Sequence, residues 1–192
     1  KAGKLLRNSI RAMLQNASDS RMVGRLTQKM VEVIQEDLTN PRGQRNVIDG
    51  EAELLEGFEF NISGKLGTTL YAPFTGTIDR VAGTLTANIP AFVPINMLAA
   101  PGGSTHFKII SAGAEVDFEN ETFVMDAQAT AVLPWDSAAT AVSTLVNTGT
   151  ANSTHPLFLA LGIEFYQEVN GQMYPLKNGA FNPLSLVKVT GL

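Results

Sequence analysis

The strongest constraint on the fold of this chain is a change of composition near residue 57. Residues 1–56 hold 9 of the 14 Lys and Arg residues and 8 of the 18 Asp and Glu residues, whereas all aromatic residues (10 Phe, 3 Tyr and 1 Trp) follow Gly57. A charged segment without aromatic residues, followed by one rich in Phe, Gly, Pro and Thr, predicts helices first and strands second. This order indicates an α+β fold rather than the alternating elements of a parallel sheet. We expect a helical segment over residues 1–56 and an antiparallel β-sandwich over residues 57–192.

Periodic apolar residues predict two helices in the first segment. One is short and amphipathic, with apolar positions at Leu6, Ile10, Met13 and Leu14. Residues 16–20 supply turn and capping side chains before the second helix. That helix should end before Pro41, because proline disfavours helix in the preceding residue. Its apolar stripe comprises Met22, Val23, Leu26, Met30, Val33, Ile34 and Leu38. Residues 41–50 are expected to form a connector, and residues 51–56 a possible short helix.

Turn signals predict antiparallel hairpins in the second segment. Asn170-Gly171 is the strongest, and a two-residue turn there places Phe165, Val169 and Leu176 on the core face. Further hairpins are expected around residues 119–121 and 80–83, with a last strand over residues 184–189. About seven short strands at this spacing indicate a sandwich of the immunoglobulin or fibronectin type III kind.

Residues 127–154 are harder to interpret, because Ala, Ser and Thr dominate them. A loop and a short helix around Ala138, Val142 and Leu145 are both compatible with this composition.

A weak internal repeat places one histidine in each copy. His106 follows Ser104-Thr105 and precedes Glu115, whereas His155 follows Ser153-Thr154 and precedes Glu164 at the same distance. We interpret the copies as two equivalent strand pairs. Two His and two Glu side chains could together bind a metal ion, but their spacing matches no known ligand motif. We therefore expect no metal site and no cofactor.

Alternating carboxylates form a second candidate cluster at Glu115, Asp117 and Glu119, with Glu121 beyond the turn. Several carboxylates in proximity could bind calcium, but the spacing is not that of an EF-hand loop and the glycine of that loop is absent. The polar face of an amphipathic hairpin is the simpler interpretation.

Basic residues follow helical faces in the first segment, at Lys1, Lys4, Arg7 and Arg11 and at Arg21, Arg25 and Lys29. A basic stripe can bind phosphate, but no aromatic residues are interleaved for base stacking, and the net charge of −4 opposes general nucleic-acid binding. We expect solvated helix faces and no nucleic-acid partner.

Several functional classes are disfavoured by missing motifs. The chain has no cysteine, so a disulfide scaffold, a thiol nucleophile and a cysteine-ligated zinc site are excluded. Prolines interrupt the longest apolar run, residues 89–101, so no segment reaches the roughly 20 residues of a membrane span. Residues 63–68 superficially suggest a phosphate loop but lack its spacing. No nucleophile elbow is present, and we expect a protein that is not an enzyme and has no catalytic residues.

Five stretches of the chain resemble a group of uncharacterised proteins from Bacteroidota: residues 1–7, 16–30, 42–61, 104–124 and 154–171. The group has no assigned activity or site residues, so the resemblance implies none here. Its members extend further at the N-terminus with a basic, glycine-containing, strand-like segment. The resemblance therefore implies that a chain beginning at Lys1 is a trimmed or processed form.

These observations favour a non-catalytic structural or interaction subunit that self-associates into a homo-oligomer or polymer, such as a surface, filament or virion-like building block. Residues 184–189 are apolar and suggest an open sheet edge for such contacts. The alternative is a carbohydrate- or ligand-binding sandwich, for which Trp135, Tyr71 and Tyr166 are the candidate stacking residues. We expect an extracellular or cell-surface location, with a cytoplasmic or virion-associated one as the alternative.

Overall fold

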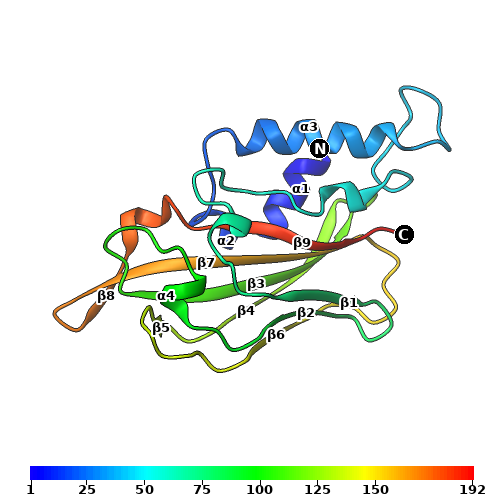
Figure 1. Ribbon diagram of the computed structural model, residues 1–192. Helices are drawn as coiled ribbons and strands as arrows, with labels where there is room; N and C mark the ends of the chain where they lie inside the picture. The colour runs from blue at the N-terminus through cyan, green and yellow to red at the C-terminus, as the bar shows by residue number, and fades with distance from the viewer.

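The computed structural model describes all 192 residues, from Lys1 to Leu192. Figure 1 shows helices stacked on one face of a six-stranded antiparallel sheet, with a three-stranded sheet beneath the other face. The three helices at the N-terminus precede all strands in the chain, which confirms the predicted α+β order and the packing of antiparallel sheets. The closer likeness to an immunoglobulin or fibronectin type III domain stays a prediction.

The helical layer contains α1 (Ala2–Ser9), α2 (Arg11–Leu14), α3 (Met22–Gln35) and the 3-10 turn η1 (Ala52–Leu55). Helix α3 ends at Gln35, earlier than expected, and Leu38 is 87% exposed. The physical reason is Asp37, whose carboxylate accepts the backbone N–H groups of Thr39 and Asn40. Such a local side-chain bond competes with the helix for backbone donors. The prediction that Leu38 belongs to the buried stripe is therefore wrong.

The large sheet places four strands in the order β4-β3-β7-β8, with β5 beside β3 and β9 beside β7. Its strands are β3 (His106–Asp117), β4 (Thr122–Ala129), β5 (Leu133–Pro134), β7 (Leu157–Val169), β8 (Gln172–Pro175) and β9 (Leu184–Thr190). The small sheet contains β1 (Thr75–Asp79), β2 (Thr84–Ile89) and β6 (Ser143–Thr148). Short helical turns complete the chain at η2 (Leu66–Thr68), α4 (Pro94–Met97) and η3 (Leu176–Gly179).

The three predicted hairpins are present as β1–β2, β3–β4 and β7–β8. At the last one, Asn170 and Gly171 both have positive φ, as a two-residue turn requires, and Val169 pairs with Gln172. Phe165 and Leu176 are buried as expected, but Val169 is 45% exposed. The hairpin extends past the rest of the molecule (Figure 1), so Val169 lies beyond the apolar core that buries Phe165.

The proposed short helix within residues 127–154 is absent. This segment instead contains β5 and β6, and β6 pairs with β2 in the small sheet. Leu145 points inward from β6 and is buried, whereas Val142 is exposed.

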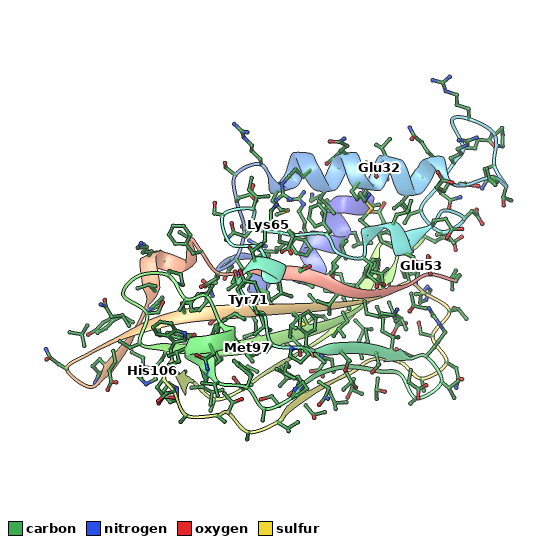
Figure 2. All side chains as sticks on the ribbon, in the orientation of Figure 1. Glu32, Glu53, Lys65, Tyr71, Met97 and His106 are labelled. Carbon is green, nitrogen blue, oxygen red and sulfur yellow. The ribbon has the colours of Figure 1, made fainter.

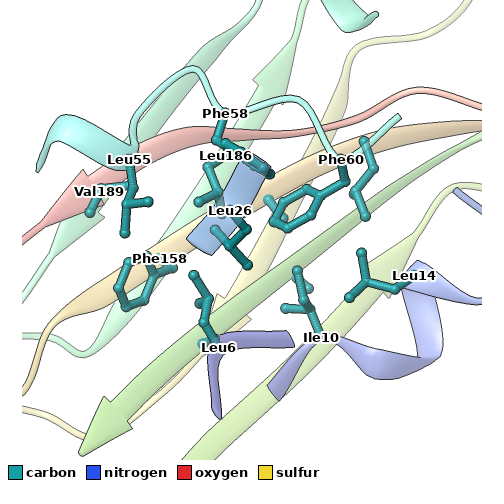
Figure 3. Close-up of a cluster of buried hydrophobic side chains, with 14 of the residues drawn as sticks. Leu6, Ile10, Leu14, Leu26, Leu55, Phe58, Phe60, Phe158, Leu186 and Val189 are labelled. Atoms are coloured by element: carbon teal, nitrogen blue, oxygen red, sulfur yellow. The ribbon is translucent and has the colours of Figure 1, made fainter. Parts of the chain in front are cut away.

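Two apolar cores hold the layers together. The helix–sheet core joins the helical layer to the large sheet (Figure 3) and includes Leu6, Ile10, Leu26, Leu55, Phe60, Phe158 and Leu186. The inter-sheet core lies between the two sheets and includes Leu85, Ile89, Phe107, Ile109, Leu145, Leu159 and Phe165. Alternation along β3 and β7 supplies both cores, because successive side chains point to opposite faces.

Candidate interaction surfaces

The two histidine-containing repeats form the centre of the large sheet. Strands β3 and β7 pair antiparallel, and each continues into its own hairpin strand, which gives the order β4-β3-β7-β8. Because the repeats run in opposite directions, equivalent residues lie at opposite ends. His106 lies near Glu168, at 3.8 Å, whereas His155 lies near Asp117, at 3.7 Å. Since β3 spans 12 residues, the two histidines are more than about 30 Å apart and cannot share a metal ion.

The alternating carboxylates Glu115 and Asp117 do not form a common site, because each has a different structural role. Glu115 is buried and accepts hydrogen bonds from the Ser153 hydroxyl and the Thr150 backbone N–H. Burial alone would raise the pKa of Glu115, but these hydrogen bonds hold it below the ordinary value. Asp117 instead accepts the N–H groups of Glu119 and Asn120 and closes the β3–β4 turn. No group of three or more His, Asp or Glu residues in the structure could hold a metal ion.

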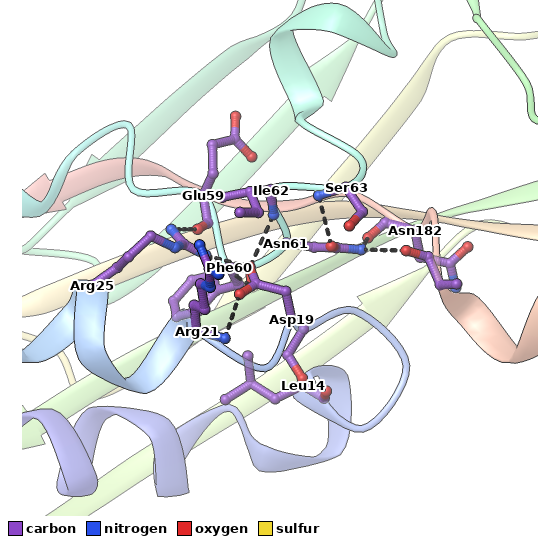
Figure 4. Close-up of polar contacts among 12 residues, drawn as sticks. Leu14, Asp19, Arg21, Arg25, Glu59, Phe60, Asn61, Ile62, Ser63 and Asn182 are labelled. Carbon is purple, nitrogen blue, oxygen red and sulfur yellow. Dashed lines mark hydrogen bonds and ion pairs between the residues drawn. The ribbon is translucent and has the colours of Figure 1, made fainter.

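Arg25 was expected on a solvated basic helix face. Its side chain instead connects helix α3 to residues 59 and 60. Figure 4 shows its guanidinium paired with the Asp19 carboxylate and donating to the carbonyl oxygens of Glu59 and Phe60. The guanidinium also lies over the Phe58 ring, 5.2 Å from its centroid. Lys29 is likewise paired, with Glu32 on the same helix. Both cations are therefore already paired with carboxylates, and Arg25 in addition connects two parts of the fold.

Residues 63–68, which superficially suggest a phosphate loop, already have a carboxylate of the same chain as a hydrogen-bond partner. The Leu66 backbone N–H donates to the Glu59 carboxylate, which takes the place that a phosphate oxygen would need. Burial raises the pKa of Glu59 above the ordinary value.

The three candidate stacking residues do not form a common exposed platform. Trp135 is half-buried against the inter-sheet core and donates its indole N–H to the Leu98 carbonyl. Tyr166 is half-buried too, and its hydroxyl donates to the Glu164 carboxylate. Only Tyr71, labelled in Figure 2, is mainly exposed, at 60%.

Tyr166 belongs to a polar cluster that the sequence analysis did not assemble. The Lys108 ammonium lies 3.4 Å from the Glu164 carboxylate and over the Tyr166 ring. Burial alone would lower the pKa of Lys108, but these two neighbours raise it above the ordinary value. All three side chains lie on the face of the large sheet that carries the helices, beyond the end of the helical layer. Each is engaged with the others, so the cluster stabilises the β3–β7 pair.

Two polar groups missed by the sequence analysis organise the loops. Arg80, in the β1–β2 turn, donates to four carbonyl oxygens, those of Ser153, His155, Thr190 and Gly191. Asp37 is fully buried and accepts four hydrogen bonds from Thr39, Asn40 and Asn46. An Asx-turn signal at Asp37-Leu38-Thr39-Asn40 was available in the sequence. Nothing local indicated the four distant partners of Arg80.

The edge of the large sheet at β9 is covered by the same chain. The Gly57 and Phe60 N–H groups donate to Leu186 and Leu184, and the Leu186 N–H donates to Phe58. Further along, the carboxylates of Glu56 and Glu53 accept the N–H groups of Val189 and Gly191. The expectation of an open edge at residues 184–189 is therefore wrong.

The opposite edge of the same sheet is not covered. Strand β4 spans eight residues and pairs with β3 alone. It carries no proline and no lysine, and its Phe123 and Val124 are exposed, Val124 at 49%. The only charge on the strand, Asp126, is engaged in accepting the backbone N–H of Thr148 in β6. Beside it, β6 exposes Val146. This side of the sandwich therefore combines unpaired strand edges with apolar side chains.

None of the helices is long and apolar enough to cross a lipid bilayer. No protein-family model matches the chain, and comparison with curated proteins and with solved structures found no similar protein. The resemblance to Bacteroidota proteins therefore stays a prediction.

Proposed function

We propose that the protein is a non-catalytic structural subunit that self-associates through the edge of β4. The observation that supports this proposal is the contrast between the two edges of the large sheet. At β9, the backbone of residues 57–60 and two carboxylates occupy the edge. By contrast, β4 has no proline, lysine or bulge to protect it, and its one charge, Asp126, is bound to Thr148 of β6.

The sequence of β4 is compatible with antiparallel pairing to a second copy. Side chains that oppose each other in a sheet share a face, so a two-fold axis passes beside a residue that faces its own copy. An axis at Val124 would place Asp126 opposite Thr122 of the other copy. Each Asp126 would then face a threonine instead of a carboxylate, so like charges do not oppose each other. Strand β6 lies on the same side and would enlarge the contact between the two copies.

The test is a charge placed on the edge. Val124→Lys should weaken association by about tenfold or more, because strand edges with lysine resist pairing. The control is Val81→Lys, which alters an exposed valine in the β1–β2 turn, away from β4. Analytical ultracentrifugation and light scattering over a concentration range give the dissociation constants.

Three outcomes would contradict the proposal. They are a strictly monomeric parent protein up to high micromolar concentration, an unchanged dissociation constant for Val124→Lys, and an equal effect of Val81→Lys. A strictly monomeric protein would favour the alternative, a ligand-binding module.

A further inference from the structure

A groove lies between the helical layer and the β3–β4 turn, and we call it the α1 groove. Its volume is about 660 Å³. Its apolar floor consists of Ala2, Leu5, Ile34, Val47, Ile48 and Phe118. Four of these residues, Ala2, Leu5, Ile34 and Phe118, also pack against the helix–sheet core. The floor therefore continues the core outward and leaves apolar surface open to solvent.

The rim of the α1 groove carries an excess of positive charge. Lys1, Lys4 and Arg45 lie along it, against a single carboxylate, Glu121. A neighbouring hollow shares Ile34 and Arg45 with the groove and adds Arg42. This concentration of cations stands out in a chain with a net charge of −4. The groove therefore favours an anionic ligand over a cationic one.

The rim cations are available to a ligand. Lys4 forms no ion pair in the structure. Lys1 pairs with Glu121 at 3.1 Å, but both side chains are exposed, and such pairs contribute little to stability. The Arg45 guanidinium is fixed at the rim by donating to the Gln35 carbonyl oxygen. Arg45 is thus held in place, whereas the side chains of Lys1 and Lys4 can turn toward a bound anion.

We propose that the α1 groove binds a single-chain amphiphile with an anionic head group, of the long-chain carboxylate class. The alkyl chain lies on the apolar floor and the carboxylate meets Lys4 and Arg45 at the rim. The volume falls within the range of about 300–1,000 Å³ that is typical of small-molecule sites, which are mainly apolar with a few polar groups. The walls are helices, a connector and a turn, so no strand edge is present on which a peptide could add by backbone pairing.

The test uses laurate below its micelle-forming concentration, measured by isothermal titration calorimetry. We expect saturable binding of one laurate per chain and none of dodecyltrimethylammonium, which has a similar tail and the opposite charge. Lys4→Glu should weaken laurate binding by about tenfold or more, because it removes a charged partner and adds a repelling one. Arg11→Glu is the matched control, since Arg11 is exposed on α2 and does not line the groove.

A second variant tests the floor. Ala2→Phe adds a ring at a half-buried position of the groove and should reduce laurate binding without a change of rim charge. Circular dichroism confirms that each variant is folded. The proposal is overturned if laurate does not saturate, if the cationic amphiphile binds as tightly, or if Lys4→Glu and Arg11→Glu behave alike. Binding of an acidic apolar peptide in the absence of laurate binding would overturn it as well.

Discussion

Truncation of Phe158 tests whether the helical layer and the two sheets unfold together. Phe158 is 1% exposed in β7 and its ring packs edge-on against Phe118, with 6.2 Å between centroids. It lies among Leu6, Leu26 and Val189 (Figure 3), so it touches helices and sheet at once. Removal of a buried phenylalanine ring destabilises a protein by about 3–5 kcal/mol, and the aromatic pair adds about 0.5–1.5 kcal/mol.

We therefore expect Phe158→Ala to lower the free energy of unfolding by about 3.5–6.5 kcal/mol. For a chain of this length, each kcal/mol corresponds to about 2–4 °C in melting temperature, so the midpoint should fall by roughly 7–26 °C. The assay is urea unfolding followed by two signals. Far-UV circular dichroism reports the helices, and Trp135, the only tryptophan, reports the inter-sheet core that it packs against.

Both signals should move together in Phe158→Ala, because the helix–sheet core and the inter-sheet core share the strands β3 and β7. Phe165→Ala is the matched comparison from the other face of β7, where the ring is also buried, and should destabilise by about 3–5 kcal/mol. A loss below about 1 kcal/mol would refute the assigned burial. A shift of the dichroism transition with an unchanged Trp135 transition would refute the idea of one cooperative unit.

Three further predictions concern the polar groups that hold the loops. Arg80→Met should destabilise the protein by about 2–4 kcal/mol in urea unfolding. Arg80→Lys should recover less than half of the stability lost in Arg80→Met, because lysine cannot reproduce the guanidinium fork. The free energy of unfolding should fall on acidification below about pH 4.5, because the pKa of Glu115 is lower in the folded protein than the value of 4.5 in the unfolded chain. The stabilisation from Glu115 is complete above pH 4.5 and is lost as the pH falls through the folded pKa. Glu115→Gln should therefore flatten the acid limb of a plot of urea midpoint against pH; an unchanged limb would contradict this role. Burial alone would raise the pKa of Asp37, but its hydrogen bonds lower it to about 2, so Asp37→Asn should speed amide hydrogen exchange at Thr39 and Asn46 and leave exchange in β7 unchanged.

Local chemistry made much of the fold predictable from the sequence. Asn170 and Gly171 adopt positive φ at low cost, so the β7–β8 turn and its register follow from two residues. The spacing of Leu6, Ile10 and Leu26 likewise predicts helices that bury one face, and the structure buries all three. The repeated His106 and His155 segments predicted two equivalent strand pairs, and these pair as β3 and β7 at the centre of the large sheet.

The candidate surfaces depended on long-range contacts, which no local pattern contains. The distance between His106 and His155 depends on the antiparallel pairing of the two repeats, and the same sequence in a parallel arrangement would have brought them together. The α1 groove combines residues from α1, the connector and the β3–β4 turn, which are distant in the chain.

The sheet edges illustrate the same division. From the sequence alone, residues 184–189 were expected at an open edge, and the strand after residues 119–121 was expected only as one arm of a hairpin. The structure covers the first with residues 57–60 and leaves the second bare. Side-chain alternation and turn chemistry act over a few residues, so the sequence by itself determined the three hairpins and the inward position of Phe165. It did not determine β5 and β6, which lie in the segment rich in Ala, Ser and Thr. Which edge stays open depends on where a distant segment folds back, and only the tertiary structure decides that.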